Sequence, residues 1–322
     1  MIKPVTSTDQ DLAPAFRGIS AIRRLSPDHS FEEAYLNAAQ ARTRVKRFIE
    51  KFSPQCEDGV EVVERSAVGP VRIVDVIPTD LPRGCPRRAV YVHGGGLVFH
   101  DVEIFTPALM RIARLCNCIV TALDYPKVPE VDPVAAVQTV NEALRVVVGS
   151  AANQNAGFPA LVGDSIGGLM VLAAARCVPD LAGAPLFLIY PVLDLSQGRT
   201  FRSRVIHRES CFLAEDYMRG FRAIAQRGFG TEVDPLSFAA EDFEKLGPIH
   251  IVSARCDVLA DEAVAFVDRG RLAGKTIGFT SLPGMPHDFL LFSGRVPDAA
   301  EGLTIVANTL SGFLDGIGAL RC

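Results

Sequence analysis

The 322-residue chain contains no tryptophan and no Cys-x-x-Cys pair, although it has eight cysteines. Cys116 and Cys118 are its closest pair, and they lack the spacing of zinc or redox motifs. No uncharged apolar run approaches the length of a membrane span. The first ten residues also lack the apolar core of a secretory signal. These absences argue against a disulfide framework and a membrane span, and they predict a soluble, cytoplasmic protein.

An excess of basic residues is also missing. Lys and Arg number 33 against 37 Asp and Glu, which gives a net charge of -4. Such a balance provides no electrostatic attraction for nucleic acid, so no nucleic-acid partner is expected. Hydrophobic residues make up 48% of the chain, which is long enough for one large domain or two small ones with a sizeable core.

The most informative motif is Gly-Asp-Ser-Ile-Gly-Gly at residues 163–168. It follows the apolar residues 158–162 and precedes the apolar residues 169–175, as a turn between a strand and a helix would. A Gly-x-Ser-x-Gly turn in this setting is typical of a nucleophile elbow, which exposes one serine hydroxyl. Glycines flank the serine because a Cβ there would crowd the turn. The motif therefore predicts that Ser165 is a catalytic nucleophile.

A second glycine cluster, His93-Gly94-Gly95-Gly96, follows the strand-like residues 89–92. Consecutive glycines allow backbone N–H groups to turn inward on an anion, as an oxyanion hole requires. We predict that the amides of Gly94, Gly95 and Ile166 are the oxyanion donors and that His93 supports the loop. The alternative is a flexible glycine loop without a chemical role.

From residue 88 onward, short apolar strands alternate with helices. Strands are expected near 88–92, 119–123, 159–162, 186–190, 248–253 and 276–281, and helices near 105–115, 133–148, 166–177, 259–272 and 298–315. This alternation predicts an α/β fold with a largely parallel sheet that is covered on both faces. Upstream, residues 31–52 read as one amphipathic helix capped by Ser30 and Glu33, and residues 60–65 and 71–77 as a hairpin.

Residues 196–240 interrupt the alternation, and an insertion after a sheet strand usually lies above the ligand-binding edge of the sheet. We therefore predict an N-terminal cap segment (1–55), a first core part (56–195), a cap insertion (196–240) and a second core part (241–322). The alternative is that the N-terminal helix only packs on the core. The insertion begins with a basic cluster at residues 199–208, which favours a solvated cap surface over an anionic-substrate site.

A serine nucleophile needs a histidine base that a carboxylate orients, in the chain order serine, acid, histidine. His287 is the predicted base because it lies in a turn between the last expected strand and the last helix. His250 falls within a strand pattern and is expected on the sheet, and His207 is expected on the surface of the insertion.

Asp257 is the predicted acid because it follows the strand at 248–253, and Asp194, after the strand at 186–190, is the second candidate. The other nearby carboxylates have structural interpretations. Asp261 and Glu262 open the next helix, where the helix dipole stabilises acidic side chains. Asp288 is expected to point away from His287, and Asp164 is expected to make local hydrogen bonds.

Together these motifs resemble the hormone-sensitive-lipase-like family of α/β-hydrolases. The resemblance covers roughly residues 75–295 and is carried by residues 93–96, 163–168, 190–191, 257–262 and 284–289. It implies an eight-stranded sheet with a helical cap, no metal or organic cofactor, and carboxylesterase activity on small or short-chain acyl esters. It also implies the triad Ser165, Asp257 and His287, with oxyanion donors Gly94, Gly95 and Ile166.

The chain departs from the resembled family at residues 124–130 and at two positions near the motifs. Ile166 stands where a small residue is usual, which implies a tighter acyl pocket, and His100 stands where glycine is common. The expected partner is a small-molecule ester. Cleavage of an amide, a thioester or an acetylated specialised metabolite by the same triad stays open, as does a lyase or ligand receptor on this fold. The resemblance also leaves a homodimer open.

Overall fold

The structure is a computed structural model that describes residues 11–23, 30–81, 87–152, 158–210, 212–230 and 233–319. Its central sheet has eight strands in the order β1-β2-β4-β3-β5-β6-β7-β8. β1 (Val60–Val68) and β2 (Val71–Pro78) form an antiparallel hairpin, and β2 also pairs antiparallel with β4 (Cys118–Asp124). The remaining pairs are parallel. The predicted mostly parallel α/β sheet is therefore confirmed.

Five strands after the hairpin carry the loops of interest at their carboxyl ends. They are β3 (Arg87–Val92), β5 (Ala160–Asp164), β6 (Leu186–Ile189), β7 (Ile249–Cys256) and β8 (Ile277–Pro286). All run in the same direction, so the segments that follow them meet at one edge of the sheet. The glycine loop follows β3, the serine follows β5, and Asp257 and His287 follow β7 and β8.

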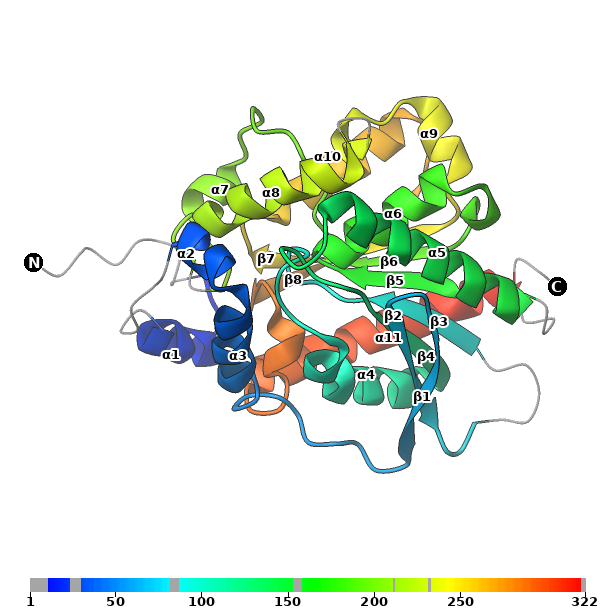
Figure 1. The fold of residues 1–322 in the computed structure, drawn as a ribbon, viewed down its shortest axis with the longest axis horizontal. Coiled ribbons are helices and arrows are strands. Elements are labelled where there is room, and N and C mark those ends of the chain that lie inside the picture. The colour runs from blue at the N-terminus through cyan, green and yellow to red at the C-terminus, as the bar shows by residue number, and fades with distance from the viewer. Residues whose placement is uncertain are drawn as a thin grey trace, which may run out of the picture.

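Helices cover both faces of the sheet (Figure 1). α4 (Val102–Cys116) and α11 (Pro297–Ala319) pack on one face, while α5 (Pro133–Ala152), α6 (Ile166–Cys177) and α10 (Ala260–Leu272) pack on the other. Each face buries its own hydrophobic cluster, with the apolar side chains of the parallel strands divided between the two. Burial on both faces explains why these strands read as continuous apolar runs rather than alternating ones.

The N-terminal region differs from its prediction in one respect. The single helix expected over residues 31–52 is divided into α2 (Phe31–Leu36) and α3 (Ala38–Ile49). Asn37 leaves the helical conformation between them, and its side-chain amide donates to the carbonyl of Glu33. Asparagine competes for backbone hydrogen bonds in this way, which disfavours a continuous helix. The capping box of Ser30 and Glu33 is confirmed.

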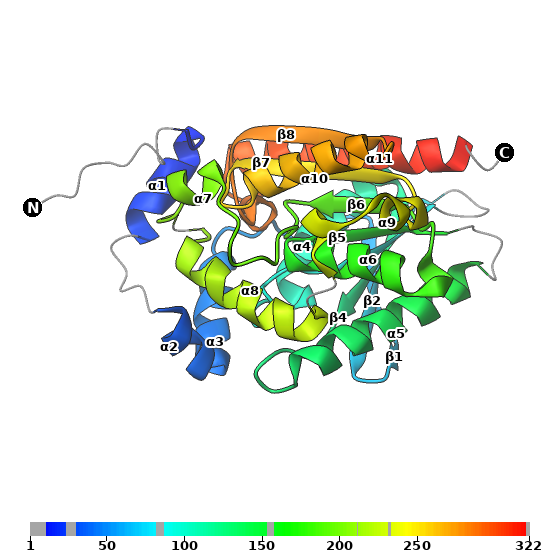
Figure 2. The same cartoon turned by 90° about the horizontal axis from the view of Figure 1, so that it is seen from above.

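Among the described residues, two α-helices lie within the predicted insertion, α7 (Arg202–Ile206) and α8 (Glu215–Phe229), and α9 (Ala240–Lys245) begins at its last residue. α8 crosses in front of the core between α2 and α5 (Figure 2). Phe31 of α2 packs edge-on against both Tyr217 and Phe221 of α8. The two predicted cap segments therefore contact each other, while the four-part division of the chain stays a prediction. α1 (Pro14–Arg23), which we did not predict, packs Phe16 against Phe212.

Candidate active site

The turn between β5 and α6 holds Ser165 in an unusual backbone conformation, with φ +52° and ψ -120°. Positive φ is uncommon for residues other than glycine, and such strain persists where surrounding structure enforces it. The enforcement here is close backbone packing. A Cβ added to Gly163 would overlap the carbonyl of Gly167, and one added to Gly167 would overlap the carbonyl of Val92. The predicted elbow is thus built by glycines that let strand and helix approach closely.

Gly167→Ala should destabilise the protein by about 1–3 kcal/mol, because the new methyl group must push the elbow away from β3. Gly149→Ala is the matched control. Gly149 lies in α5 with open space around it, so alanine should raise stability there by about 0.5–1 kcal/mol. Urea denaturation of both variants measures the two effects, and equal stability of both would contradict the packing account.

The structure brings the three residues predicted as a triad into one hydrogen-bonded line. Nε2 of His287 lies 3.0 Å from Oγ of Ser165, and Nδ1 of His287 lies 2.6 Å from Oδ2 of Asp257. All three side chains are buried. The other oxygen of Asp257 accepts the amide of Leu259, which fixes the carboxylate. This arrangement can transfer the serine proton to the imidazole and hold the resulting imidazolium in place.

The other candidate histidines lie outside this line. His250 is half-buried on the sheet, as predicted, with Nε2 2.9 Å from Oγ1 of Thr280. His207 is buried, so its predicted surface position is wrong. Asp164 was expected to make local hydrogen bonds, but its partners come from β3 and the loop after it, with the hydroxyl of Tyr91 donating at 2.5 Å.

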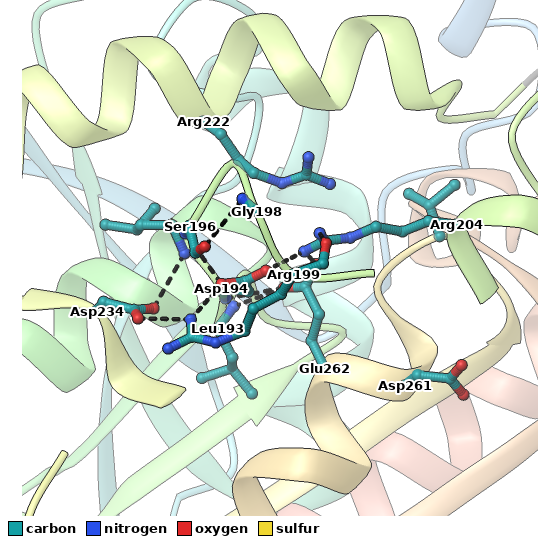
Figure 3. A network of polar contacts seen from close by, with 12 residues as sticks. Leu193, Asp194, Ser196, Gly198, Arg199, Arg204, Arg222, Asp234, Asp261 and Glu262 are labelled. Atoms are coloured by element: carbon teal, nitrogen blue, oxygen red, sulfur yellow. Dashed lines mark hydrogen bonds and ion pairs between the residues drawn. The ribbon is translucent and has the colours of Figure 1, made fainter. Parts of the chain in front are cut away.

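The second candidate acid, Asp194, belongs to a buried ionic network (Figure 3). Arg204 donates to Asp194 and Glu262 at 2.6 Å each, and Arg199 donates to Asp194 and Asp234 at 2.5 Å each. Glu262 also accepts the amides of residues 193 and 194. Asp194 is therefore paired with Arg199 and Arg204 and not with His287.

This network corrects two predictions. The basic cluster at residues 199–208 was expected to be a solvated surface; Arg202 and Arg208 are exposed as expected, but the Arg204 side chain is only 7% exposed. Glu262 was expected to be an acid stabilised by a helix dipole, but it is fully buried. Burial is the main cause that raises the pKa of Glu262 to about 7, although the charge of Arg204 lowers it. Asp261, which was expected in the same role, accepts the amide of Ser203. Asp234 and Glu262 lie 35 and 58 residues from the arginines that they bind, so the basic run alone did not reveal them.

The glycine loop after β3 differs from prediction at its first glycine. The amide of Gly94 donates to Oδ1 of Asp164 at 2.7 Å, so the prediction that it is an oxyanion donor is wrong. Among the described residues, the amides of Gly95 and Gly96 have no acceptor. Both glycines have positive φ, +106° and +62°. Gly96 was not among the predicted oxyanion donors, although its place as the third glycine of the motif was a sequence signal for that role.

The other predicted donor, Ile166, is the first residue of α6. The first amides of a helix have no acceptor within it, so this one is free to point at a ligand. Its role and that of Gly95 stay predictions. His93 supports the loop as expected, since Nδ1 donates to the carbonyl of Gly94 at 2.7 Å and its ring stacks on Tyr125.

An aromatic cluster from the insertion lies directly on the glycine loop. A Cβ added to Gly96 would overlap the ring of Phe221, which comes from α8. Phe99 of the same loop packs edge-on against Phe221 at 5.9 Å. Nothing in the sequence indicated that Phe221 lies beside the glycine loop. Only the three-dimensional packing of α8 shows that this side chain lies beside the loop.

Charges around the imidazole strongly favour its protonated form. Burial alone would lower the pKa of His287, but the carboxylates of Asp257 and Asp288 outweigh it and raise the pKa to about 9. Asp288 was expected to point elsewhere, and this prediction is wrong because its Oδ1 lies 3.6 Å from Nε2 of His287. Burial, followed by the charge of Asp288, raises the pKa of Asp164 to about 7.

Within the described ranges, no cluster of three or more His, Cys, Asp or Glu residues has the arrangement of a metal site. None of the described helices is long and apolar enough to cross a membrane.

Comparison with known proteins gives consistent matches. A family model described as the alpha/beta hydrolase fold matches residues 89–291. The chain is 28% identical over 278 residues to an ethyl acetate hydrolase of Pseudomonas putida, covering 81% of this chain and 84% of that protein. It is 27% identical over 286 residues to the esterase LipI of Mycobacterium tuberculosis, covering 78% and 87%.

Solved structures show the same fold. A thermostable esterase from Pseudomonas putida superposes with a TM-score of 0.81 at 22% identity, covering 94% of this chain and 98% of the other. An ester hydrolase from the Lake Arreo metagenome superposes with a TM-score of 0.80 at 25% identity and the same coverage. Because the family model spans well over half of the sequence, the chain belongs to the alpha/beta hydrolase fold family, in its hormone-sensitive-lipase-like branch.

Proposed function

We propose that this protein is a serine carboxylesterase that hydrolyses small or short-chain acyl esters. The observation that carries the proposal is the line from Ser165 through His287 to Asp257, with 3.0 Å and 2.6 Å between the paired atoms. The names of its relatives, an ethyl acetate hydrolase and an esterase, support the same reaction class. The proposed small-molecule partner is the ester itself. The homodimer and the cytoplasmic location remain predictions, and the proposal depends on neither.

In the first half-reaction, Oγ of Ser165 attacks the acyl carbon while its proton passes to Nε2 of His287. The negative charge that develops on the carbonyl oxygen is stabilised by the amides of Gly95, Gly96 and Ile166, each worth about 3–4 kcal/mol. The C–O bond to the alcohol then breaks, and the alcohol leaves with the proton from His287. Asp257 holds the imidazole in the required tautomer and does not itself take the proton.

In the second half-reaction, His287 removes a proton from a water molecule, and the hydroxide attacks the acyl-serine. The Ser165 Oγ leaves and regains its proton from His287, which releases the carboxylic acid. The same residues would cleave an amide, a thioester or an acetylated metabolite. Receptors on this fold typically lack a triad residue, whereas all three are present in this chain.

Hydrolysis of p-nitrophenyl acetate, butyrate and octanoate by the purified protein tests the proposal. We expect kcat/KM to be highest for acetate or butyrate and at least about tenfold lower for octanoate, because Ile166 and Phe221 crowd the elbow and the glycine loop. p-Nitroacetanilide and a p-nitrothiophenyl ester measure the competing amide and thioester activities. No turnover of any ester would contradict the proposed function.

A further inference from the structure

A second carboxylate lies beside the proposed catalytic base. Asp257 contacts Nδ1 of His287, and Oδ1 of Asp288 lies 3.6 Å from Nε2 on the other side of the ring. Nε2 is the atom that takes the serine proton. Oδ1 of Asp288 is buried and has no hydrogen-bond partner among the described residues. At 3.6 Å it is too distant for a good hydrogen bond but close enough for a strong charge interaction.

His100 holds the other side of Asp288. Its Nε2 lies 3.9 Å from Oδ2 of Asp288, and its Nδ1 is buried without a partner among the described residues. The His100 side chain is only 6% exposed and covers one side of the Asp288 side chain, of which 18% stays exposed. His100 follows the glycine loop, whereas Asp288 follows His287 directly. The two side chains thus bring the oxyanion loop and the histidine turn together.

Both residues adopt the left-handed backbone conformation, which is uncommon outside glycine although Asp and His adopt it more often than most other residues. His100 has φ +65° and Asp288 has φ +58°, and glycine adopts this region most easily. Burial of a charge without hydrogen bonds adds a further cost. Costs of this kind gather at functional sites, where neighbouring structure maintains them. Two buried polar atoms without a partner among the described residues, Nδ1 of His100 and Oδ1 of Asp288, therefore stand beside the histidine turn.

We propose that Asp288, shielded from water by His100, is a positioning residue that stabilises the imidazolium form of His287 and shifts esterase activity toward alkaline pH. This inference rests on the proposed function, because it assigns to His287 the role of base. The contacts of Asp288 at the site are with the two histidines, His100 and His287. It acts through the imidazole only.

The expected pH dependence follows from the charge of the base. His287 accepts the serine proton only when neutral, and its pKa is raised to about 9, so kcat/KM should rise with pH through about 9. The titratable and polar groups that face His287 and Asp288 come from every neighbouring loop. They are Asp164 and Ser165 at the elbow, Tyr190 after β6, Asp257 after β7, and His93, His100 and Asp101 from the glycine loop.

Asp288→Asn tests the inference, because asparagine has nearly the same shape and tolerates positive φ. We expect the midpoint of the rise of kcat/KM with pH to fall by at least about one pH unit. The kcat/KM for p-nitrophenyl acetate at pH 7 should then rise about tenfold. His100→Gly should lower the midpoint by a smaller amount, since water then reaches Asp288. Asp268→Asn removes an exposed carboxylate of α10, and its midpoint should equal that of the wild type.

A second measurement does not depend on turnover. NMR titration of the His287 ring in Ser165→Ala, with and without Asp288→Asn, reports the same shift directly. A lower midpoint with asparagine supports the inference even if no ester is hydrolysed, in which case only the proposed function fails. Equal midpoints in the two proteins would overturn the inference, whatever the activity of the wild type.

Discussion

Ser165→Ala should lower kcat for p-nitrophenyl acetate by about 10⁵-fold or more, to a rate indistinguishable from the uncatalysed background. Alanine retains the Cβ and removes only Oγ, the atom that lies 3.0 Å from Nε2 of His287. No other hydroxyl is hydrogen-bonded to that nitrogen among the described residues. Without Oγ, no acyl-enzyme forms, and the remaining residues can only bind the ester. Stopped-time assays at high enzyme concentration measure the residual rate.

Ser150→Ala is the matched control for this variant. Ser150 is exposed near the end of α5, and its hydroxyl donates only to the carbonyl of Val146. We expect wild-type kcat and KM for this control, and thermal unfolding midpoints within about 2 °C of wild type for both variants. If Ser165→Ala kept more than a few per cent of the wild-type kcat, Ser165 would not be the nucleophile.

Asp257→Asn should lower kcat by about 10⁴-fold, because an amide cannot hold the tautomer that leaves Nε2 free to accept a proton. The second candidate acid provides the comparison. Asp194→Asn should leave kcat of the folded protein within about threefold of wild type, since Asp194 lies in the arginine network. It should instead lower stability by about 3–5 kcal/mol, because Arg199 and Arg204 lose a buried partner.

The two variants are distinguished by measuring kcat and urea denaturation for each. The account requires a loss of activity without a comparable loss of stability at residue 257, and the reverse at residue 194. Loss of activity at both positions with native-like stability would show that Asp194 takes part in the chemistry. If Asp257→Asn kept wild-type kcat, Asp257 would not be the acid of the triad.

The sheet and the elbow were predictable because their signals are local. Apolar runs of four to six residues mark the parallel strands, and the glycines around Ser165 mark a turn that only small residues permit. The geometry also joins His287 to Ser165, as chain order and loop position had indicated. The strand runs and the elbow depend on neighbours within about ten residues, which a single sequence displays, whereas the Ser165–His287 contact spans 122 residues and was indicated only by chain order and loop position.

Two of the failed predictions concern contacts between remote segments, and a third concerns chain neighbours. Arg204 was expected in solvent, yet it meets Glu262, 58 residues away. Gly94 was expected to bind the oxyanion, yet its amide is committed to Asp164, 70 residues away. Asp288 is adjacent to His287 in sequence, but its left-handed backbone turns the carboxylate back toward the imidazole. Neither residue type nor spacing encodes such pairings, so they emerge only when the fold is known.

The central claim is that Ser165 is a nucleophile activated by His287 and Asp257. Incubation with a fluorophosphonate, followed by intact-protein and peptide mass spectrometry, tests it most directly, because the reaction leaves a stable covalent bond on the attacking atom. The account predicts one adduct per chain, located on Ser165, absent in Ser165→Ala and formed much more slowly in His287→Ala. An adduct on another residue, or an unlabelled wild-type protein, would contradict the account.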